Sequence, residues 1–256
     1  MRSFIAFTKK ELLEQVRSGK LLITGTLFLA IGIMNPAVAK LTPWLLEFFA
    51  DSLAGSGITV TGITVSAMDS WVQFFKNIPI GLIVFVLLQS SVLTKEISNG
   101  TLVFSLTKGL QRYKVVLSKS AVISVLWTVG YFICFVVTYA YNSYFWDNSV
   151  AESLSAAILC WWLFGIFVIS LIILSSVLTS SSSGVLLVTG GVVLLSYLIG
   201  LLPNVGKYLP TKLIDGNSLI YGLAKPAEYL FAIIITLLIT VLCFAVSIPL
   251  FNKKQL

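Results

Sequence analysis

Residues 90–119 read SSVLTKEISNGTLVFSLTKGLQRYKVVLSK and form a long polar, strongly basic interruption between two apolar runs. In membrane proteins, short loops with an excess of Lys and Arg stay on the cytoplasmic side. This stretch is therefore predicted to be the largest cytoplasmic loop of a membrane protein, with its central part at residues 95–114.

The residues inside this loop predict a helix, a break and a second short helix. Leu93 and Ile97 can continue the preceding helix beyond the membrane, and Asn99-Gly100 then ends it because glycine tolerates a left-handed backbone. Thr101 can cap the short helix that follows, which is expected to lie across the membrane surface. This short helix is expected to present Leu102, Val103 and Leu106 on one side, to end at Lys108-Gly109, and to be followed by the headgroup anchors Arg112, Lys114 and Lys119.

The composition supports a polytopic membrane protein. Hydrophobic residues make up 57% of the chain and charged residues 11%, with a mean hydropathy of +0.99, and a water-facing domain needs more charge than this. The net charge of +7 does not indicate nucleic acid, because the basic residues gather on one side of the predicted bilayer. There is no histidine, and Cys134, Cys160 and Cys243 lie in apolar runs without CxxC spacing, so neither a metal or cofactor site nor a disulfide framework is expected.

Six apolar runs are long enough to cross about 30 Å of hydrocarbon, which takes roughly 20 helical residues. Residues 1–20 precede them and combine basic residues with an apolar side at roughly helical spacing, which favours an amphipathic helix in the inner interface, although a basic flank that orients the first span remains the alternative. The apolar side consists of Phe4, Ile5, Leu12, Leu13 and Val16. The whole chain, 1–256, is therefore predicted to be one all-α transmembrane domain. The predicted spans are residues 21–39, 78–94, 115–140, 150–178, 184–202 and 229–251.

Two segments on the other side of the membrane are long enough to hold structure of their own. Residues 40–77 predict an external loop with short interfacial helices at 43–49 and 69–75, unless the second span begins nearer Ser70. Residues 203–228 carry prolines, glycines and amphipathic turns, which favour short interfacial or re-entrant helices. In the fifth span, Gly190, Gly191 and Gly200 are candidates for close approach by another helix.

The charges decide the orientation of the six spans. With both termini in the cytoplasm, twelve of the 17 basic residues lie inside and five outside, whereas three acidic residues lie inside and seven outside. This asymmetry fits the positive-inside rule. The inner basic residues are Arg2, Lys9, Lys10, Arg17, Lys20, Lys95, Lys108, Arg112, Lys114, Lys119, Lys253 and Lys254, and the outer ones are Lys40, Lys76, Lys207, Lys212 and Lys225.

The spans lack the residues that catalysis or ion coupling needs. No Asp, Glu, Lys, Arg or His lies in the middle of a predicted span, whereas proton- and ion-coupled transporters keep such groups at mid-membrane. The chain also has no phosphate-binding loop, so no catalytic residue is expected and ATP hydrolysis would belong to another chain. Gln89, Ser90 and Ser91 form a polar cluster, which either lines a substrate path or hydrogen-bonds to neighbouring helices.

The order of a Glu below a span, a Gly-Thr-Leu, a basic residue and a Lys at the next span resembles the cytoplasmic loop of ABC-2-type transporter permeases. These residues are Glu96, Gly100, Thr101, Leu102, Arg112 and Lys119, with Gly109-Leu110-Gln111 where the family usually has a proline before the Arg. KKELLEQVRSGKLL at residues 9–22 is similar to the family's elbow helix. The resemblance implies a coupling helix that docks on a separate ATPase through Glu96, Gly100, Thr101, Leu102, Val103, Leu106 and Arg112. Glu96 is a carboxylate in a basic loop, and it is expected to make a charged contact with either the ATPase or the elbow helix.

The resemblance also implies a function. It predicts a permease subunit in a bacterial plasma membrane, paired with a second copy or a related permease and with a cytosolic ABC ATPase that binds ATP and Mg. ATP binding would push the loop and rock the spans, exporting an amphiphilic peptide, lipid or drug-like cargo. The alternative from another class is a membrane sensor or assembly scaffold that uses the same loop to bind a cytosolic partner.

Overall fold

The computed structural model describes residues 2–49, 64–107, 109–202 and 204–254, and this part of the chain consists of helices, turns and loops without a strand. Six helices are long and apolar enough to cross a membrane, which confirms the all-α prediction and fits a multi-pass membrane protein. They are α2 (Lys20–Phe48), α4 (Ala67–Gln89), α7 (Arg112–Phe145), α8 (Leu154–Leu178), α9 (Ser182–Gly200) and α11 (Leu230–Lys253). Shorter elements are α1 (Arg2–Arg17), α5 (Thr94–Ser98), α6 (Thr101–Thr107), α10 (Gly216–Ile220) and the 3-10 turns η1 (Asn148–Val150), η2 (Gly206–Tyr208), η3 (Pro210–Ile214) and η4 (Pro226–Tyr229).

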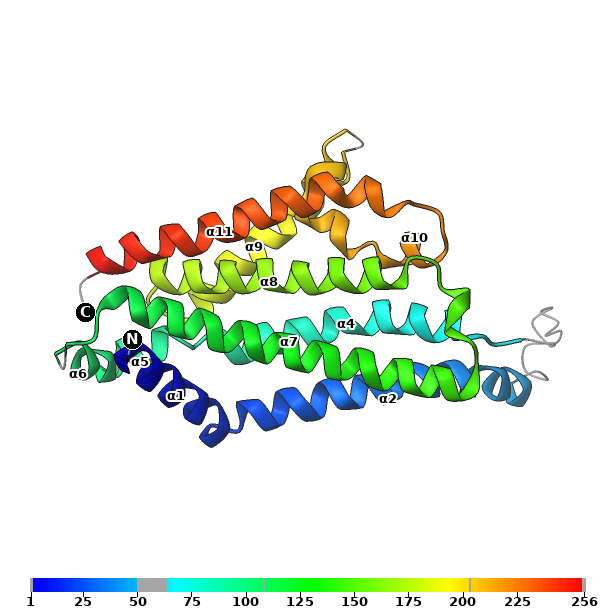
Figure 1. Cartoon of the computed structure of the whole chain (residues 1–256), viewed down its shortest axis with the longest axis horizontal. Coiled ribbons are helices and arrows are strands. Elements are labelled where there is room, and N and C mark those ends of the chain that lie inside the picture. Colours follow the sequence, from blue (N-terminus) through cyan, green and yellow to red (C-terminus); the bar gives the residue numbers. More distant parts are fainter. Residues whose placement is uncertain (1, 50–63, 108, 203, 255–256) are drawn as a thin grey trace.

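The long helices run along the longest axis of the molecule and give it two ends (Figure 1). The basal end carries α1, α5, α6 and the first and last described residues, and the distal end carries η1 and α10 (Figure 1). Helix α8 is buried along most of its length and packs against α4, α7, α9 and α11. Helix α9 has only Val185 and Thr189 buried among its residues, so it lies at the periphery.

The interfacial helices predicted at 43–49 and 69–75 are wrong as separate elements, whereas the alternative of a second span that begins nearer Ser70 is correct, since α4 begins at Ala67. Residues 43–49 are mostly the last turns of α2, which continues through Pro36 and Pro43 to Phe48. Residues 69–75 are early turns of α4, because Ser66 caps this helix and Asp69 Oδ2 accepts the Ser66 backbone N–H at 2.8 Å. The rest of the predicted loop, residues 50–63, lies outside the described residues, as do Lys108 and Pro203.

A proline in α2 is compensated by side chains from two other helices. Pro36 has no N–H, so it leaves the carbonyl of Gly32, one turn earlier, without its helical partner. Thr138 of α7 donates to that carbonyl at 3.0 Å, and Asn35 in turn donates to Thr138 at 3.1 Å. Asn77 of α4 donates to Asn35 at 2.9 Å. This distal amide network of Asn35, Asn77 and Thr138 joins α2, α4 and α7 without any charge.

The glycines at close helix contacts are not those expected from the sequence. A Cβ at Gly190 or Gly191 would meet nothing within 4 Å, and one at Gly200 would meet Thr211 Oγ1 of η3 at 3.0 Å rather than another long helix. Tight positions on the long helices include Gly81, Gly130 and Gly165 instead. There a Cβ would lie 2.9 and 2.7 Å from the Phe28 ring at Gly81 and Gly130, and 2.1 Å from the Trp127 ring at Gly165.

Between α9 and α11, the chain forms short helices as predicted. They fold back onto the long helices, with Leu213, Leu219 and Ile220 buried and Trp161 of α8 donating to the Ile214 carbonyl at 2.7 Å. Their position relative to the membrane surface stays a prediction.

Candidate functional site

The break between α5 and α6 lies where the sequence predicts it. Gly100 has a φ of +67°, in the left-handed region that favours glycine, and α6 begins at the next residue. Thr101 does not act as the predicted cap, because its hydroxyl donates backward to the Glu96 carbonyl at 3.3 Å. The hydroxyl therefore ties α6 to α5 across the break.

Helix α6 divides its apolar residues between two directions. Leu102 is buried and Leu106 packs against the core, whereas Val103 and Phe104 are exposed, Phe104 by 71% of its surface. The predicted single face of Leu102, Val103 and Leu106 is therefore wrong, because the short helix needs Leu102 and Leu106 to hold it against the rest of the chain. A partner can contact Val103 and Phe104 directly but not Leu102.

Glu96 lies inside an ionic cluster that joins α1, α5 and α7. Its carboxylate contacts Lys10 Nζ of α1 and lies 2.8 Å from Lys119 Nζ of α7. Lys119 also lies 2.7 Å from Glu11 Oε2, and the side chains of Lys119 and Glu11 are only 1% and 3% exposed. Lys119 is thus a buried ion-pair partner rather than the predicted headgroup anchor. We call Lys10, Glu11, Glu14, Glu96 and Lys119 the basal ion cluster.

Lys10 fills the centre of the three carboxylates in this cluster. Glu11, Glu14 and Glu96 converge closely enough to hold a cation, and the ammonium of Lys10 contacts all three, at 3.1 Å from Glu11 and 2.9 Å from Glu14. Burial by itself lowers the pKa of Lys10, but Glu96, Glu11 and Glu14 outweigh it and raise the pKa above its usual value of 10.5. A raised pKa means that Lys10 stays protonated and keeps its ion pairs in full at neutral pH, and that these pairs weaken only above pH 10.5.

Helix α1 turns a largely polar side toward the protein. Phe7, Glu11 and Gln15 follow one another at four-residue spacing and are all buried. The residues predicted to form its apolar side are exposed, among them Ile5, Leu12, Leu13 and Val16. Helix α1 is therefore held by polar contacts and leaves most of its apolar side uncovered by this chain.

The polar cluster at the end of α4 makes hydrogen bonds within the chain. Gln89 and Gln15 exchange two side-chain hydrogen bonds at 3.2 and 3.3 Å. Ser91 accepts from Lys20 at 3.2 Å, and Ser90 donates to the Leu87 carbonyl at 2.9 Å. Of the two interpretations open from the sequence, contact between helices therefore has the hydrogen bonds of Gln89 and Ser91 in its favour. Gln89 holds α1, and Ser91 holds Lys20 at the start of α2.

Arg112 is engaged at the end of the last span. Its guanidinium donates to the carbonyl oxygens of Phe251, Asn252 and Lys254 at 3.0, 3.1 and 2.6 Å, where a cation also complements the C-terminal end of α11. Lys254 then donates to the carbonyl oxygens of Val177 and Thr179, at 2.8 and 2.7 Å, at the end of α8. Arg112 and Lys254 form a basal clasp that joins the start of α7 to the ends of α11 and α8.

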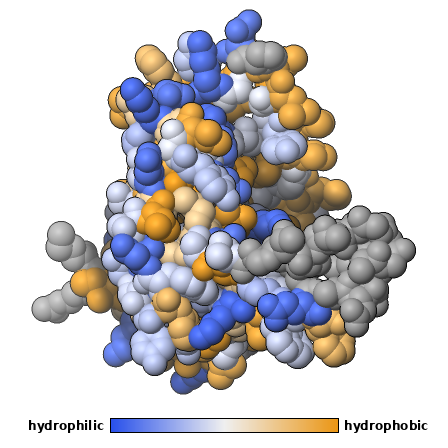
Figure 2. Space-filling model, turned by 90° about the vertical axis from the view of Figure 1, so that its right-hand side faces the viewer, coloured by the Kyte–Doolittle hydropathy of each residue, from blue (hydrophilic) through white to orange (hydrophobic). Residues whose placement is uncertain are grey.

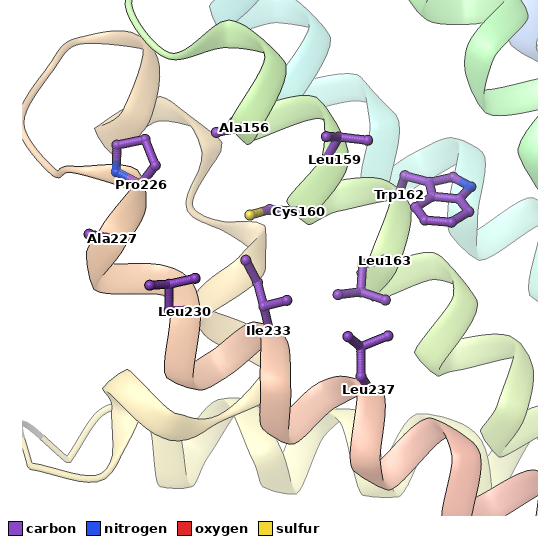
Figure 3. Close-up of a pocket in the computed structure, with 10 residues that line it drawn as sticks. All are labelled: Ala156, Leu159, Cys160, Trp162, Leu163, Pro226, Ala227, Leu230, Ile233 and Leu237. Carbon is purple, nitrogen blue, oxygen red and sulfur yellow. The ribbon is translucent and has the colours of Figure 1, made fainter.

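A separate apolar groove lies between α8 and α11 toward the distal end (Figure 3). Its volume is about 520 Å³, and the Trp162 N–H, which is one of its few polar groups, is already donated to Thr128 Oγ1 at 3.0 Å. Such a groove offers only apolar contact. Its lining residues are Ala156, Leu159, Cys160, Trp162, Leu163, Pro226, Ala227, Leu230, Ile233 and Leu237.

The break at Gly100 lies where the sequence predicts it, and Glu96 makes a charged contact with α1, one of the two contacts expected of it, but the part of Lys119 in this cluster was not predicted. A hint was present, since Lys119 stands within an apolar run and a buried ammonium needs a carboxylate beside it. No protein-family model matches the chain, and no curated protein matches its sequence.

Proposed function

We propose that this chain is the membrane subunit of an ATP-driven exporter and that α6 docks on a separate ATPase subunit. The observation that carries the proposal is the arrangement of α6, a short helix outside the six long ones that exposes Val103 and Phe104 while Leu102 holds it from behind. An exposed aromatic residue on a supported helix is the kind of anchor on which protein interfaces depend.

The contacts behind α6 connect the proposed docking helix to the long helices. Glu96 connects α5 to α1 and α7 through the basal ion cluster, and Arg112 and Lys254 connect α7 to α11 and α8. A displacement of α6 would therefore act on several spans together, as a rocking mechanism requires. Glu96 and Arg112 act here as positioning residues within the chain and do not themselves face the ATPase.

The distribution of basic residues indicates on which side of the membrane the proposed complex forms. The excess of basic residues at the basal end supports a cytoplasmic position for that end, where ATP is available. In this proposal the membrane is a bacterial plasma membrane. ATP and Mg would be bound by the partner ATPase. Two permease subunits would work together, and the apolar groove at α8 and α11 suits the apolar part of an amphiphilic peptide, lipid or drug-like cargo.

The test is site-directed photocrosslinking in the native host. A photoreactive phenylalanine analogue at Phe104 is expected to capture a protein with a phosphate-binding loop, and the purified complex is expected to hydrolyse ATP. The same analogue at Tyr144, an aromatic residue at the distal end that is 83% exposed, is the matched control and should capture no ATPase. Phe104→Ser should weaken the association by roughly 2 kcal/mol or more if Phe104 is an interface anchor.

The outcome also separates the two classes of function. Capture at Phe104 of a partner without a nucleotide-binding loop, in a complex without ATPase activity, would contradict the exporter and favour a sensor or scaffold. Stimulation of hydrolysis by an added amphiphile would favour the exporter.

A further inference from the structure

A second cavity lies at the distal end, where α7 ends and α8 begins. Its volume is about 520 Å³, and aromatic rings and polar groups line it together, unlike the apolar groove between α8 and α11. Figure 2 shows this end of the molecule, with hydrophilic residues over much of the face. The lining residues are Phe135, Tyr139, Ser143, Trp146, Asp147, Asn148, Ser149, Leu154 and Ser155, and we call this cavity the distal aromatic pocket.

The aromatic wall of the pocket is held in place by its neighbours. Phe135 and Tyr139 are one turn apart on α7, with ring centroids 5.8 Å from each other. Asn148 donates to the Tyr139 carbonyl at 3.2 Å and accepts from Trp71 of α4 at 3.0 Å. These bonds fold η1 back against α7, so the pocket is formed before any ligand arrives.

Asp147 supplies a negative charge at the pocket. Its carboxylate accepts the Ser149 side-chain hydroxyl at 2.6 Å and the Ser149 backbone N–H at 2.9 Å, and these bonds lower its pKa, so it is ionised at neutral pH. Among the residues that the structure describes, no Lys or Arg lies within ion-pair distance of this carboxylate. The nearby Lys40 of α2 instead lies over the Phe145 ring, 3.4 Å from its centroid. An ammonium of the chain itself thus sits on an aromatic ring at this end.

An anion beside several aromatic rings selects for organic cations. The face of an aromatic ring attracts ammonium groups. A carboxylate repels anions and has no charge–charge attraction to a neutral ligand of the same shape. We propose that the distal aromatic pocket binds an organic ammonium group through Asp147, Tyr139 and Trp146, with the apolar substituent against Phe135 and Leu154. The ammonium can belong to a zwitterionic lipid headgroup or to a free cationic amphiphile, since both present the same chemistry.

This inference deepens the proposed function, because it would place an ammonium group at the polar end of the cargo or of a bound lipid. Binding itself needs no ATPase, so it is measured on the purified chain alone. Failure of ammonium binding with intact capture at Phe104 would overturn only this inference. Failure of capture at Phe104 with intact ammonium binding would overturn only the exporter.

The experiment measures binding of benzyltrimethylammonium to the full chain in maltoside micelles, which contain no ammonium. Saturable binding is expected for this cation and not for its uncharged isostere neopentylbenzene or for the anion benzenesulfonate. Asp147→Asn should weaken binding about tenfold, and Tyr139→Leu or Trp146→Leu about two- to fivefold each, as an exposed cation–π contact implies. Glu152→Gln, which removes another exposed distal carboxylate outside the pocket, is the matched control and should bind as the wild type does.

A second arm identifies the source of the ammonium. In phosphatidylcholine nanodiscs, a headgroup that occupies the pocket would compete with the probe and raise its apparent Kd, whereas unchanged affinity assigns the pocket to a free cation. Equal binding of the cation and its uncharged isostere would overturn the proposal. So would unchanged binding in Asp147→Asn and Trp146→Leu variants whose unfolding temperatures match the wild type.

Discussion

The two ends of the molecule join their helices by different chemistry. At the basal end, α1, α5 and α7 meet through the charged side chains of the basal ion cluster. Toward the distal end, α2, α4 and α7 meet through the uncharged Asn35, Asn77 and Thr138. Helix α7 takes part in both, so one helix is held by ion pairs near its start and by neutral hydrogen bonds near its end.

The difference follows from the position of each network along the spans. The distal amide network lies within the apolar helices, where a charge is costly and a neutral amide or hydroxyl needs only a partner. The basal ion cluster lies where α1 and α5 meet the basal end of α7, outside the long apolar stretches, and its outer member Glu14 is still exposed to water. Ion pairs there contribute little net stability when intact, but losing one member leaves a charge buried without a partner. The basal end is therefore the more sensitive of the two to a single substitution.

The largest effect is expected from Lys119→Met. This change leaves the buried Glu11 Oε2 without its ammonium, and such a loss costs about 3–5 kcal/mol of unfolding free energy. Denaturant unfolding in micelles would measure this loss. Lys114→Met is the control, because Lys114 is on the same helix as Lys119 but donates a hydrogen bond to Ser3 at an exposed position. Adding Glu11→Leu to Lys119→Met should restore part of the loss. Equal stability of the two lysine variants would show that the cluster does not hold α1.

A smaller effect is expected from Thr138→Val in the distal amide network. The variant leaves the Gly32 carbonyl and the Asn35 amide without a partner but buries no charge, so the cost should be about 1–3 kcal/mol. Thr26→Val is the matched control, since Thr26 is exposed and donates to the Leu22 and Ile23 carbonyls of its own helix. A loss at Thr138 that equals or exceeds the loss at Lys119 would refute the contrast between the two ends.

The smallest effect is expected within the basal end itself, from Glu14→Gln. Glu14 pairs with Lys10 at 2.9 Å, but both side chains are 45% exposed, so the pair should contribute no more than about 1 kcal/mol. Raising the salt concentration should shrink even this difference. A loss as large as that of Lys119→Met, measured in the same unfolding experiment, would mean that the exposure of a side chain does not determine how much its ion pair contributes to stability.

Much of the fold could be predicted because apolar runs and single glycines determine the local backbone conformation. A run of about 20 apolar residues must be a helix in a membrane, since every backbone N–H and C=O then finds a partner inside its own segment. The break at Asn99-Gly100 was predictable for the same reason, because a positive φ is a property of one residue. The distal end of α2 was misjudged and the distal start of α4 was left open, because the polar and proline residues there resemble loop residues.

The partners of the candidate site were decided by which helices lie side by side. The sequence by itself determined that Glu96 is an acid in a basic loop and that Lys119 begins an apolar run. Only the tertiary structure placed Lys119 against Glu11, 108 positions away in the chain, and set Arg112 on the carbonyl oxygens that end α11. The same holds for Thr138, whose hydroxyl reaches the carbonyl freed by Pro36 of another helix. The physical reason is that a membrane helix is specified by its own residues, whereas a buried polar group is satisfied by whichever neighbour the packing brings within about 3 Å.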